Sequence, residues 1–169
     1  MDESEARRIV TTYSNLILRL SYTYLKSTHE AEDVCQNVFL KYMDDNTEFL
    51  SEEHEKAWII RTTINTCKNV LKSAYRTKVV VMDEISENVS EEEPYAEVRE
   101  AVLLLPKNYR IAIYLFYFEG YSAKEIAVFM GKSENAVTLY LSRGRRKLRE
   151  ILKNYGKGRA EYYEQSFGK

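Results

Sequence analysis

The residues best suited to chemistry in this sequence are cations and asparagines at helical spacing. Residues 143–149 contain five cations, namely Arg143, Arg145, Arg146, Lys147 and Arg149. Such a run suits the neutralisation of DNA phosphates. Cations near a helix C-terminus also favour the helix dipole, so a plain solvated helix face is the alternative interpretation of this run taken alone.

A second polar group lies near residue 65. Arg61, Asn65, Asn69 and Lys72 are separated by four, four and three residues, which places them on one stripe of a helix. Asparagines suit hydrogen bonds to base edges, and flanking cations suit phosphate contacts. The two groups together favour nucleic-acid recognition.

Patterns for catalysis, metal binding or membrane insertion are missing from the sequence. No nucleophile–base set or phosphate-binding loop is present. The four candidate metal ligands lack the close-paired spacing of zinc sites; they are His29, Cys35, His54 and Cys67. The N-terminus opens with acids, and no stretch reaches the apolar length of a membrane span. We therefore expect a cytoplasmic protein that is not an enzyme and needs no metal or cofactor.

The charge is unevenly distributed, although the net charge is only −1. Residues 98–155 carry 11 basic and 5 acidic side chains, whereas residues 73–97 carry 2 and 7. A basic C-terminal module behind an acidic segment indicates a module that binds a polyanion.

Apolar residues recur at helical spacing and predict an all-α fold of two small helical domains. The first domain, residues 1–73, is predicted to hold three helices, with Thr28 as N-cap of the second and the third starting near Glu53. The predicted inward faces are Ile9, Tyr13, Leu16, Ile17, Leu20 and Tyr24, then Ala31, Val34, Cys35, Val38 and Tyr42, then Ile60, Ile64, Cys67 and Leu71.

Residues 74–95 are predicted to be a flexible acidic linker, because the run SENVSEEEP has too few bulky residues to order itself. Fully extended, these 22 residues reach roughly 70–80 Å. Two turns of DNA measure about 70 Å, so the linker is long enough for two modules to bind sites two turns apart.

The second domain, residues 96–155, is predicted to contain a helix-turn-helix. Helical patterning runs through Val98–Leu105, and a new helix from Pro106 to about Phe118 follows. Ser122 and Glu125 then form a capping box, and Gly131 supplies the turn. The next helix has Ser133 as its cap and an inward face of Val137, Leu141, Gly144 and Leu148. Its N-terminal end would enter the major groove, which makes Glu134, Asn135 and Thr138 the candidate base readers. The tail from residue 156 is expected to be frayed or only partly helical.

Two ordered sets of residues resemble sigma factors of the extracytoplasmic-function (ECF) type. The first set, which resembles region four, comprises Leu105-Pro106, Arg110, Glu119-Gly120, Ser122, Glu125-Ile126-Ala127, Gly131, Ser133, Val137 and Arg143-Gly-Arg145-Arg-Lys-Leu148. The second set, which resembles region two, comprises Glu32-Asp33, Gln36, Phe39, Trp58, Arg61, Asn65 and Lys68-Asn69.

The resemblance implies three contact surfaces. It implies that core RNA polymerase is bound by Glu32, Asp33, Gln36, Asn37 and Phe39. It implies that the single-stranded downstream promoter element is bound by Arg61, Asn65, Lys68, Asn69, Lys72 and Arg76. It implies that the upstream duplex is bound by Ser133, Glu134, Asn135, Thr138, Tyr140, Ser142, Arg143, Arg145 and Arg146. An anti-sigma factor is a further partner of many family members.

Five positions depart from the family pattern, two of them being Gly144, where alanine is frequent, and Ile64, where a polar or basic residue is frequent. Thr138, Leu139 and Tyr140 stand where basic or small polar residues are common. Losing two phosphate contacts lowers the salt slope of binding by nearly two, at about 0.9 per contact. The alternatives to a sigma factor are a stand-alone helix-turn-helix regulator and an adaptor that binds only proteins.

Overall fold

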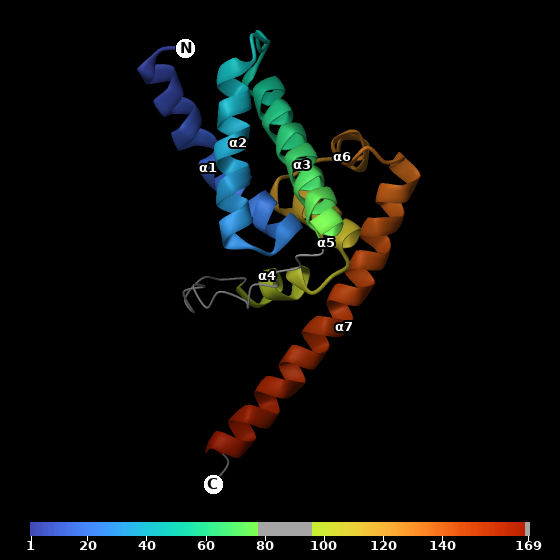
Figure 1. Cartoon of the computed structure of the whole chain (residues 1–169). Coiled ribbons are helices and arrows are strands. Elements are labelled where there is room, and N and C mark those ends of the chain that lie inside the picture. The colour runs from blue at the N-terminus through green and yellow to red at the C-terminus, as the bar shows by residue number, and fades with distance from the viewer. Residues whose placement is uncertain (78–95, 168–169) are drawn as a thin grey trace. The chain divides into compact units, whose positions relative to one another are not determined.

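The computed structural model describes residues 1–77 and 96–167, with the backbone alone at 74–77 and 157–167. All regular structure in these residues is helical, which confirms the predicted all-α class (Figure 1). The chain divides into two compact units, and the division runs through α6 (Ala123–Met130).

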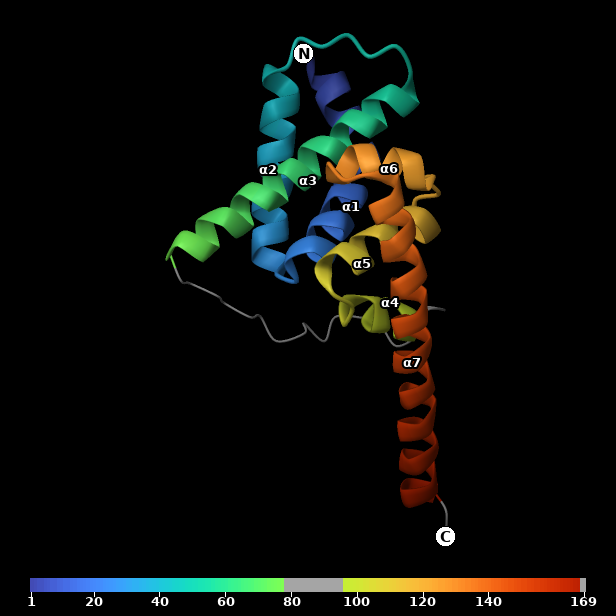
Figure 2. The ribbon, with the colours of Figure 1, turned by 90° about the vertical axis from the view of Figure 1, so that its right-hand side faces the viewer.

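The first unit is built on three helices that lie side by side (Figures 1 and 2). They are α1 (Glu3–Leu25), α2 (Thr28–Asp44) and α3 (Glu52–Thr77), and each packs against the other two. Their apolar stripes meet in a core that includes Ile9, Ile17, Leu20, Val34, Val38, Ile59, Ile60 and Ile64. The predicted inward faces are confirmed, except that Leu16 and Leu71 are only half-buried.

Side-chain caps fix the starts of the first two helices. The Asp2 carboxylate accepts the amide of Glu5, and the Ser27 hydroxyl accepts the amide of Glu30. The predicted cap at Thr28 is therefore wrong by one residue. A serine is as good a cap as a threonine, and Ser27 has the extended backbone that a cap requires while Thr28 already lies in the helix.

The second unit contains α4 (Ala96–Leu103), α5 (Lys107–Ile113), the π-helical turn η1 (Tyr114–Phe118), and α7 (Glu134–Phe167). Both α4 and α5 pack against α7. A Cβ built at Gly144 would lie 3.1 Å from Ile113 Cγ1 and 3.4 Å from Tyr109 Cβ. The glycine therefore permits the close approach of α5 and α7, as predicted.

Three predicted boundaries differ from the structure. The helix from Pro106 divides at Ile113, where the backbone changes from α to π. Helix α3 continues to Thr77, past the predicted linker start at residue 74; residues 78–95 of the predicted linker lie outside the described residues. The tail is helical as far as Phe167, because a helix that is already formed propagates easily and two glycines cost it only about 1 kcal/mol each.

Candidate nucleic-acid interface

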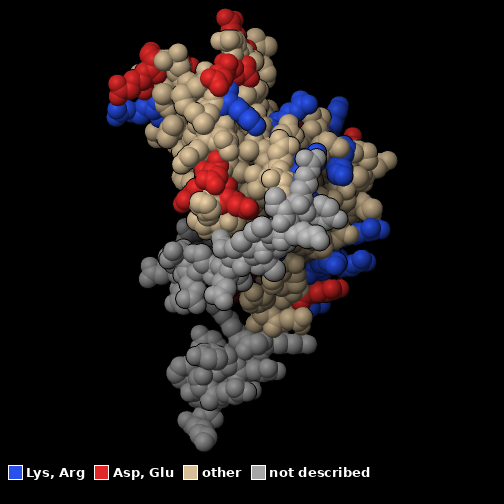
Figure 3. Space-filling model, viewed as in Figure 1, with Lys and Arg blue, Asp and Glu red and all other residues tan. Residues whose placement is uncertain are grey.

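One exposed polar stripe runs along the first four turns of α7. At about 100° per residue, Arg145 and Arg149 each lie about 20° around the helix from Thr138. All members of the stripe are exposed; they are Asn135, Thr138, Ser142, Arg145, Arg146 and Arg149. In Figure 3, basic side chains gather over the part of α7 that is drawn in colour. The stripe therefore combines groups that can read bases with groups that can neutralise phosphates.

Of the five cations in the run, Arg143 lies at the edge of this stripe and Lys147 lies away from it. Arg143 is about 140° and Lys147 about 180° from Thr138 around the helix. The predicted DNA contact Tyr140 also lies on another side and is half-buried, with its ring centroid 5.9 Å from that of Tyr109. The structure therefore does not group Tyr140 with the other predicted upstream residues, whereas the exposed Arg143 lies at the edge of the stripe, about 60° from Arg146.

Polar contacts fix the starts of α6 and α7. The Ser122 hydroxyl accepts the Glu125 amide while the Glu125 carboxylate accepts the Ser122 amide, which confirms the capping box. Gly131 has φ of +64°, in the left-handed region that favours glycine. The Ser133 hydroxyl accepts the amide of Ala136, so this predicted DNA contact also caps α7. Glu134 occupies the exposed first turn.

A second exposed polar stripe runs along α3. Arg61, Asn65, Asn69 and Lys72 are all exposed and follow one another along the helix, whereas Ile60 and Ile64 are fully buried on the opposite face. Lys68, predicted to belong with them, is half-buried. The backbone of Arg76 lies in the same helix, but its side chain is outside the described residues.

A third polar surface lies on α2. Its exposed members are the four predicted residues Glu32, Asp33, Gln36 and Asn37, and they lie opposite the buried Val34 and Val38. Phe39 is half-buried at the edge of this surface. The polar face that the sequence pattern predicts is therefore present.

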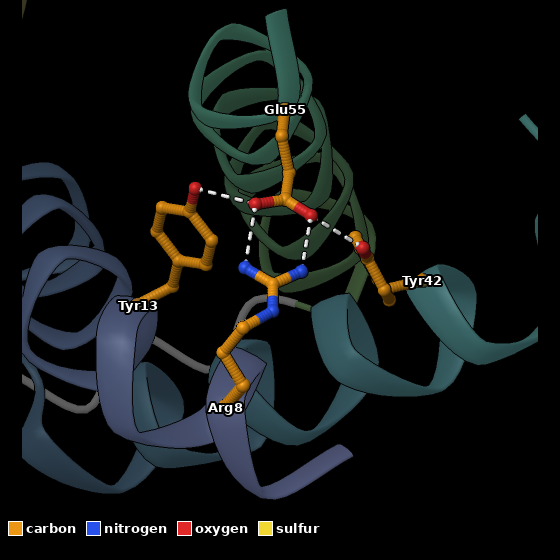
Figure 4. Close-up of polar contacts among 4 residues, drawn as sticks. All are labelled: Arg8, Tyr13, Tyr42 and Glu55. Atoms are coloured by element: carbon orange, nitrogen blue, oxygen red, sulfur yellow. Dashed lines mark hydrogen bonds and ion pairs between the residues drawn. The ribbon is translucent and has the colours of Figure 1, made fainter. Parts of the chain in front are cut away.

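A buried polar cluster that the sequence analysis missed lies in the first unit (Figure 4). Glu55 of α3 is only 5% exposed. Its carboxylate accepts hydrogen bonds from Arg8 at 3.1 and 2.9 Å, from the Tyr13 hydroxyl at 2.7 Å and from the Tyr42 hydroxyl at 2.6 Å. One carboxylate thus connects all three helices of the bundle.

The cluster shifts the titration of its members. The hydrogen bonds from Arg8, which outweigh the effect of burial, lower the pKa of Glu55 to about 2. Burial, together with the hydrogen bond to Glu55, raises the pKa of Tyr42 to about 12 and also raises the pKa of Tyr13. Glu55 is thus ionised and both phenols are protonated at neutral pH.

The cysteines are buried in the first unit, as predicted. Cys35 and Cys67 are both free of disulfides, and burial raises the pKa of each thiol, to about 12 for Cys67. Among the described residues, no three His, Cys, Asp or Glu side chains are grouped so that they could hold a metal ion.

Two family models match the chain in order along the sequence. Residues 9–77 match Sigma-70 region 2, and residues 95–148 match Sigma-70 region 4. The RNA polymerase sigma factor SigZ of Bacillus subtilis is 31% identical over 127 residues, which are 72% of this chain and 72% of that protein. The chain belongs to the ECF family of RNA polymerase sigma factors.

Other relatives of this sigma factor match over more of its length. The ECF RNA polymerase sigma factor SigE of Mycolicibacterium smegmatis is 25% identical over 90% of this chain, which spans 63% of SigE. The ECF RNA polymerase sigma factor SigW of Bacillus subtilis is also 25% identical, over 90% of this chain and 91% of SigW.

Solved structures share the fold of this sigma factor. The sigma factor RpoE, in a complex with the anti-sigma factor NepR from Bartonella quintana, superposes with a TM-score of 0.74 at 20% identity, over 88% of this chain and 97% of RpoE. CnrH, in a complex with the cytosolic domain of CnrY, gives 0.60 at 19% identity, over 90% of each chain.

The stripes fall inside the matched regions of the sigma factor. The α2 surface and the α3 stripe lie in region 2, and nearly all of the α7 stripe lies in region 4. No helix in the described ranges is long and apolar enough to cross a membrane.

Proposed function

We propose that this sigma factor binds core RNA polymerase and directs promoter recognition, DNA melting and transcription initiation. The observation that carries the proposal is the pair of exposed stripes on the two matched regions, one rich in asparagine on α3 and one rich in arginine on α7. The two chemistries suit two forms of DNA, because unpaired bases need hydrogen-bonding partners and duplex backbones need cations.

The first unit is proposed to contact both polymerase and melted DNA. The exposed face of α2 is the docking surface for the polymerase, through Glu32, Asp33, Gln36 and Asn37, with Phe39 at its edge. The α3 stripe binds the separated strand of the downstream element, since Asn65 and Asn69 lie between two cations that can hold its phosphates.

The second unit is proposed to bind the upstream element as duplex. The exposed side chains at the start of α7, Glu134, Asn135 and Thr138, read base edges in the major groove. Arg145, Arg146 and Ser142 contact phosphates further along the stripe. Arg143, at the edge of the stripe, is proposed to contact a phosphate as well, whereas Tyr140 is left out because it lies on another side of the helix.

The remaining sequence predictions follow from these partners. The protein acts as a binding subunit, without catalysis or a cofactor of its own, in the cytoplasm where promoter DNA and polymerase meet. An anti-sigma factor is a proposed further partner, since the similar RpoE was solved with one.

Run-off transcription with purified core polymerase on a pool of random promoters tests this function. We expect the protein to co-elute with core polymerase in gel filtration and to enrich templates that share an upstream and a downstream element. Failure to associate with core polymerase would refute the proposal. Tight, specific duplex binding without polymerase would instead favour a stand-alone regulator, and unchanged promoter complexes after Arg145→Ala with Arg146→Ala would favour an adaptor.

A further inference from the structure

We propose that Tyr117 and Arg145 form a joint phosphate clamp, in which the Tyr117 phenol orients the Arg145 guanidinium and donates its own proton to the same DNA phosphate. This inference deepens the proposed upstream function, on which it rests. Both residues belong to the second unit, so the argument depends on the geometry of that unit alone.

The first observation is the contact itself. Arg145 Nη1 donates a hydrogen bond to the Tyr117 hydroxyl oxygen at 3.2 Å. A phenol can accept one hydrogen bond while it donates another, so its proton stays available for a further acceptor. Within the described residues, no carboxylate lies within ion-pairing distance of Arg145. The guanidinium therefore keeps its charge uncompensated, and its remaining N–H groups can bind an anion.

The second observation is the way in which Tyr117 is presented. The buried face of α5 continues into η1 as far as Leu115, and Phe116 is half-buried. Tyr117, at 54% exposed, lies beyond this face in the wide π turn. Its ring meets that of Phe116 edge to face, with centroids 5.0 Å apart. The ring is thus held at the surface by a neighbour that is itself anchored.

The third observation is the position of the pair on the stripe. Arg145 lies on the same side of α7 as Thr138, whereas Arg143 and Lys147 do not. The pair therefore joins the π turn η1 to the stripe of α7 that is proposed to face DNA. Tyr117 and Arg145 are 28 residues apart in the sequence. A phosphodiester has several oxygens, so the phenol and the guanidinium can each bind a different oxygen of one group.

Random-sequence duplex DNA of about 25 base pairs is the probe, because a phosphate contact carries no base preference. Fluorescence anisotropy with the full chain between 50 and 200 mM salt gives both affinity and salt slope. We expect Tyr117→Phe to weaken binding about 3- to 10-fold with an unchanged slope, because it removes a hydrogen bond but no charge. Arg145→Ala should lower the slope by about 0.9.

The double variant distinguishes a clamp from two separate contacts. In the Arg145→Ala background, Tyr117→Phe should have less than half of its single effect; full additivity would overturn the clamp. Tyr155→Phe, which removes a half-buried phenol on another side of α7, is the matched control and should bind as the unchanged chain does. An equal thermal midpoint for Tyr117→Phe and the unchanged chain excludes a folding effect.

Two further outcomes decide the proposal. Unchanged affinity for Tyr117→Phe would overturn it, as would failure of the unchanged chain to bind the duplex pool at the lowest salt. Failure of the clamp can be told apart from failure of the proposed sigma-factor function. If that function were wrong, the protein would not associate with core polymerase. Tyr117→Phe should leave this association intact.

Discussion

Both terminal nitrogens of the Arg8 guanidinium donate to the carboxylate of Glu55, at 3.1 and 2.9 Å. The carboxylate is buried, whereas the Arg8 side chain is 49% exposed. The ion pair thus closes the cluster from the solvent side, while the Tyr13 and Tyr42 hydroxyls satisfy the carboxylate from within. This arrangement holds α3, which carries the proposed DNA stripe, against α1 and α2.

Glu55→Gln should destabilise the protein by about 1–3 kcal/mol, because it replaces charge-assisted hydrogen bonds with neutral ones and leaves an amide hydrogen facing Arg8. Urea unfolding measures the change. Glu3→Gln is the matched control, since Glu3 pairs with Arg7 fully at the surface and should change stability by less than about 0.5 kcal/mol. Equal effects of the two variants would contradict the role of the buried cluster.

Stability should fall in acid through Glu55. The folded pKa of about 2 lies below the ordinary value of 4.5, so the contribution is complete above pH 4.5 and is lost as the pH falls toward 2. Urea midpoints measured between pH 5 and pH 3, within this window, should drop less steeply in Glu55→Gln than in the unchanged chain. Parallel pH profiles would show that the carboxylate is not the group responsible.

A loss of stability in alkali should accompany the titration of Tyr42. Its pKa is raised from 10 to about 12 in the folded protein, so its contribution is complete below pH 10 and is lost as the pH rises toward 12. Tyr42→Phe should flatten the alkaline limb of the urea midpoint. If the urea midpoint of Tyr42→Phe falls as steeply in alkali as that of the unchanged chain, groups other than Tyr42 cause the loss of stability.

The α7 stripe predicts unequal effects for neighbouring cations. Arg146→Ala and Arg149→Ala should each lower the salt slope of promoter binding by the polymerase complex by about 0.9. Lys147→Ala, on the opposite side of α7 from Thr138, is the control and should leave the slope within error. Filter binding across a salt series measures all three, and equal slopes for the three variants would argue against a directional interface.

The asparagines of α3 predict a defect at melted DNA. Asn65→Ala and Asn69→Ala should each reduce open complexes on a promoter by roughly tenfold, the range of one lost base-edge contact. Permanganate reactivity of unpaired thymines gives the measurement. Asn15→Ala, an exposed asparagine on α1, is the control. Because the contacts are to unpaired bases, the defect should persist on a template with a preformed bubble.

The helices and their faces could be predicted from the sequence because local rules determine them. Ile60 and Ile64 lie at core spacing, and Gly131 and Ser122 have turn and cap roles that few other residues satisfy. All five cations of residues 143–149 are exposed, as expected for charged positions away from the apolar face of a helix.

Contacts between distant residues could not be predicted in this way. Glu55 precedes the buried Ile59 by four residues, so it is an acid on an apolar helix face, and this was the one local indication of the cluster. The partner of Glu55, Arg8, is 47 residues away in the sequence. The spacing of apolar residues does not predict the π turn at Tyr114–Phe118, because the change from α to π hydrogen bonding is confined to a single turn. The ring contact between Tyr109 and Tyr140 likewise joins residues that are distant in the sequence, so local spacing does not indicate it.

The two native thiols have a practical consequence for studying this protein. Since Cys35 and Cys67 are buried and hard to ionise, maleimide reagents should not modify them. A cysteine introduced at an exposed position of each unit would then be the reactive site, without prior removal of the natural pair. Paired spin or fluorescent labels placed in this way can report how the separation of the two promoter-binding units changes as polymerase and DNA are added.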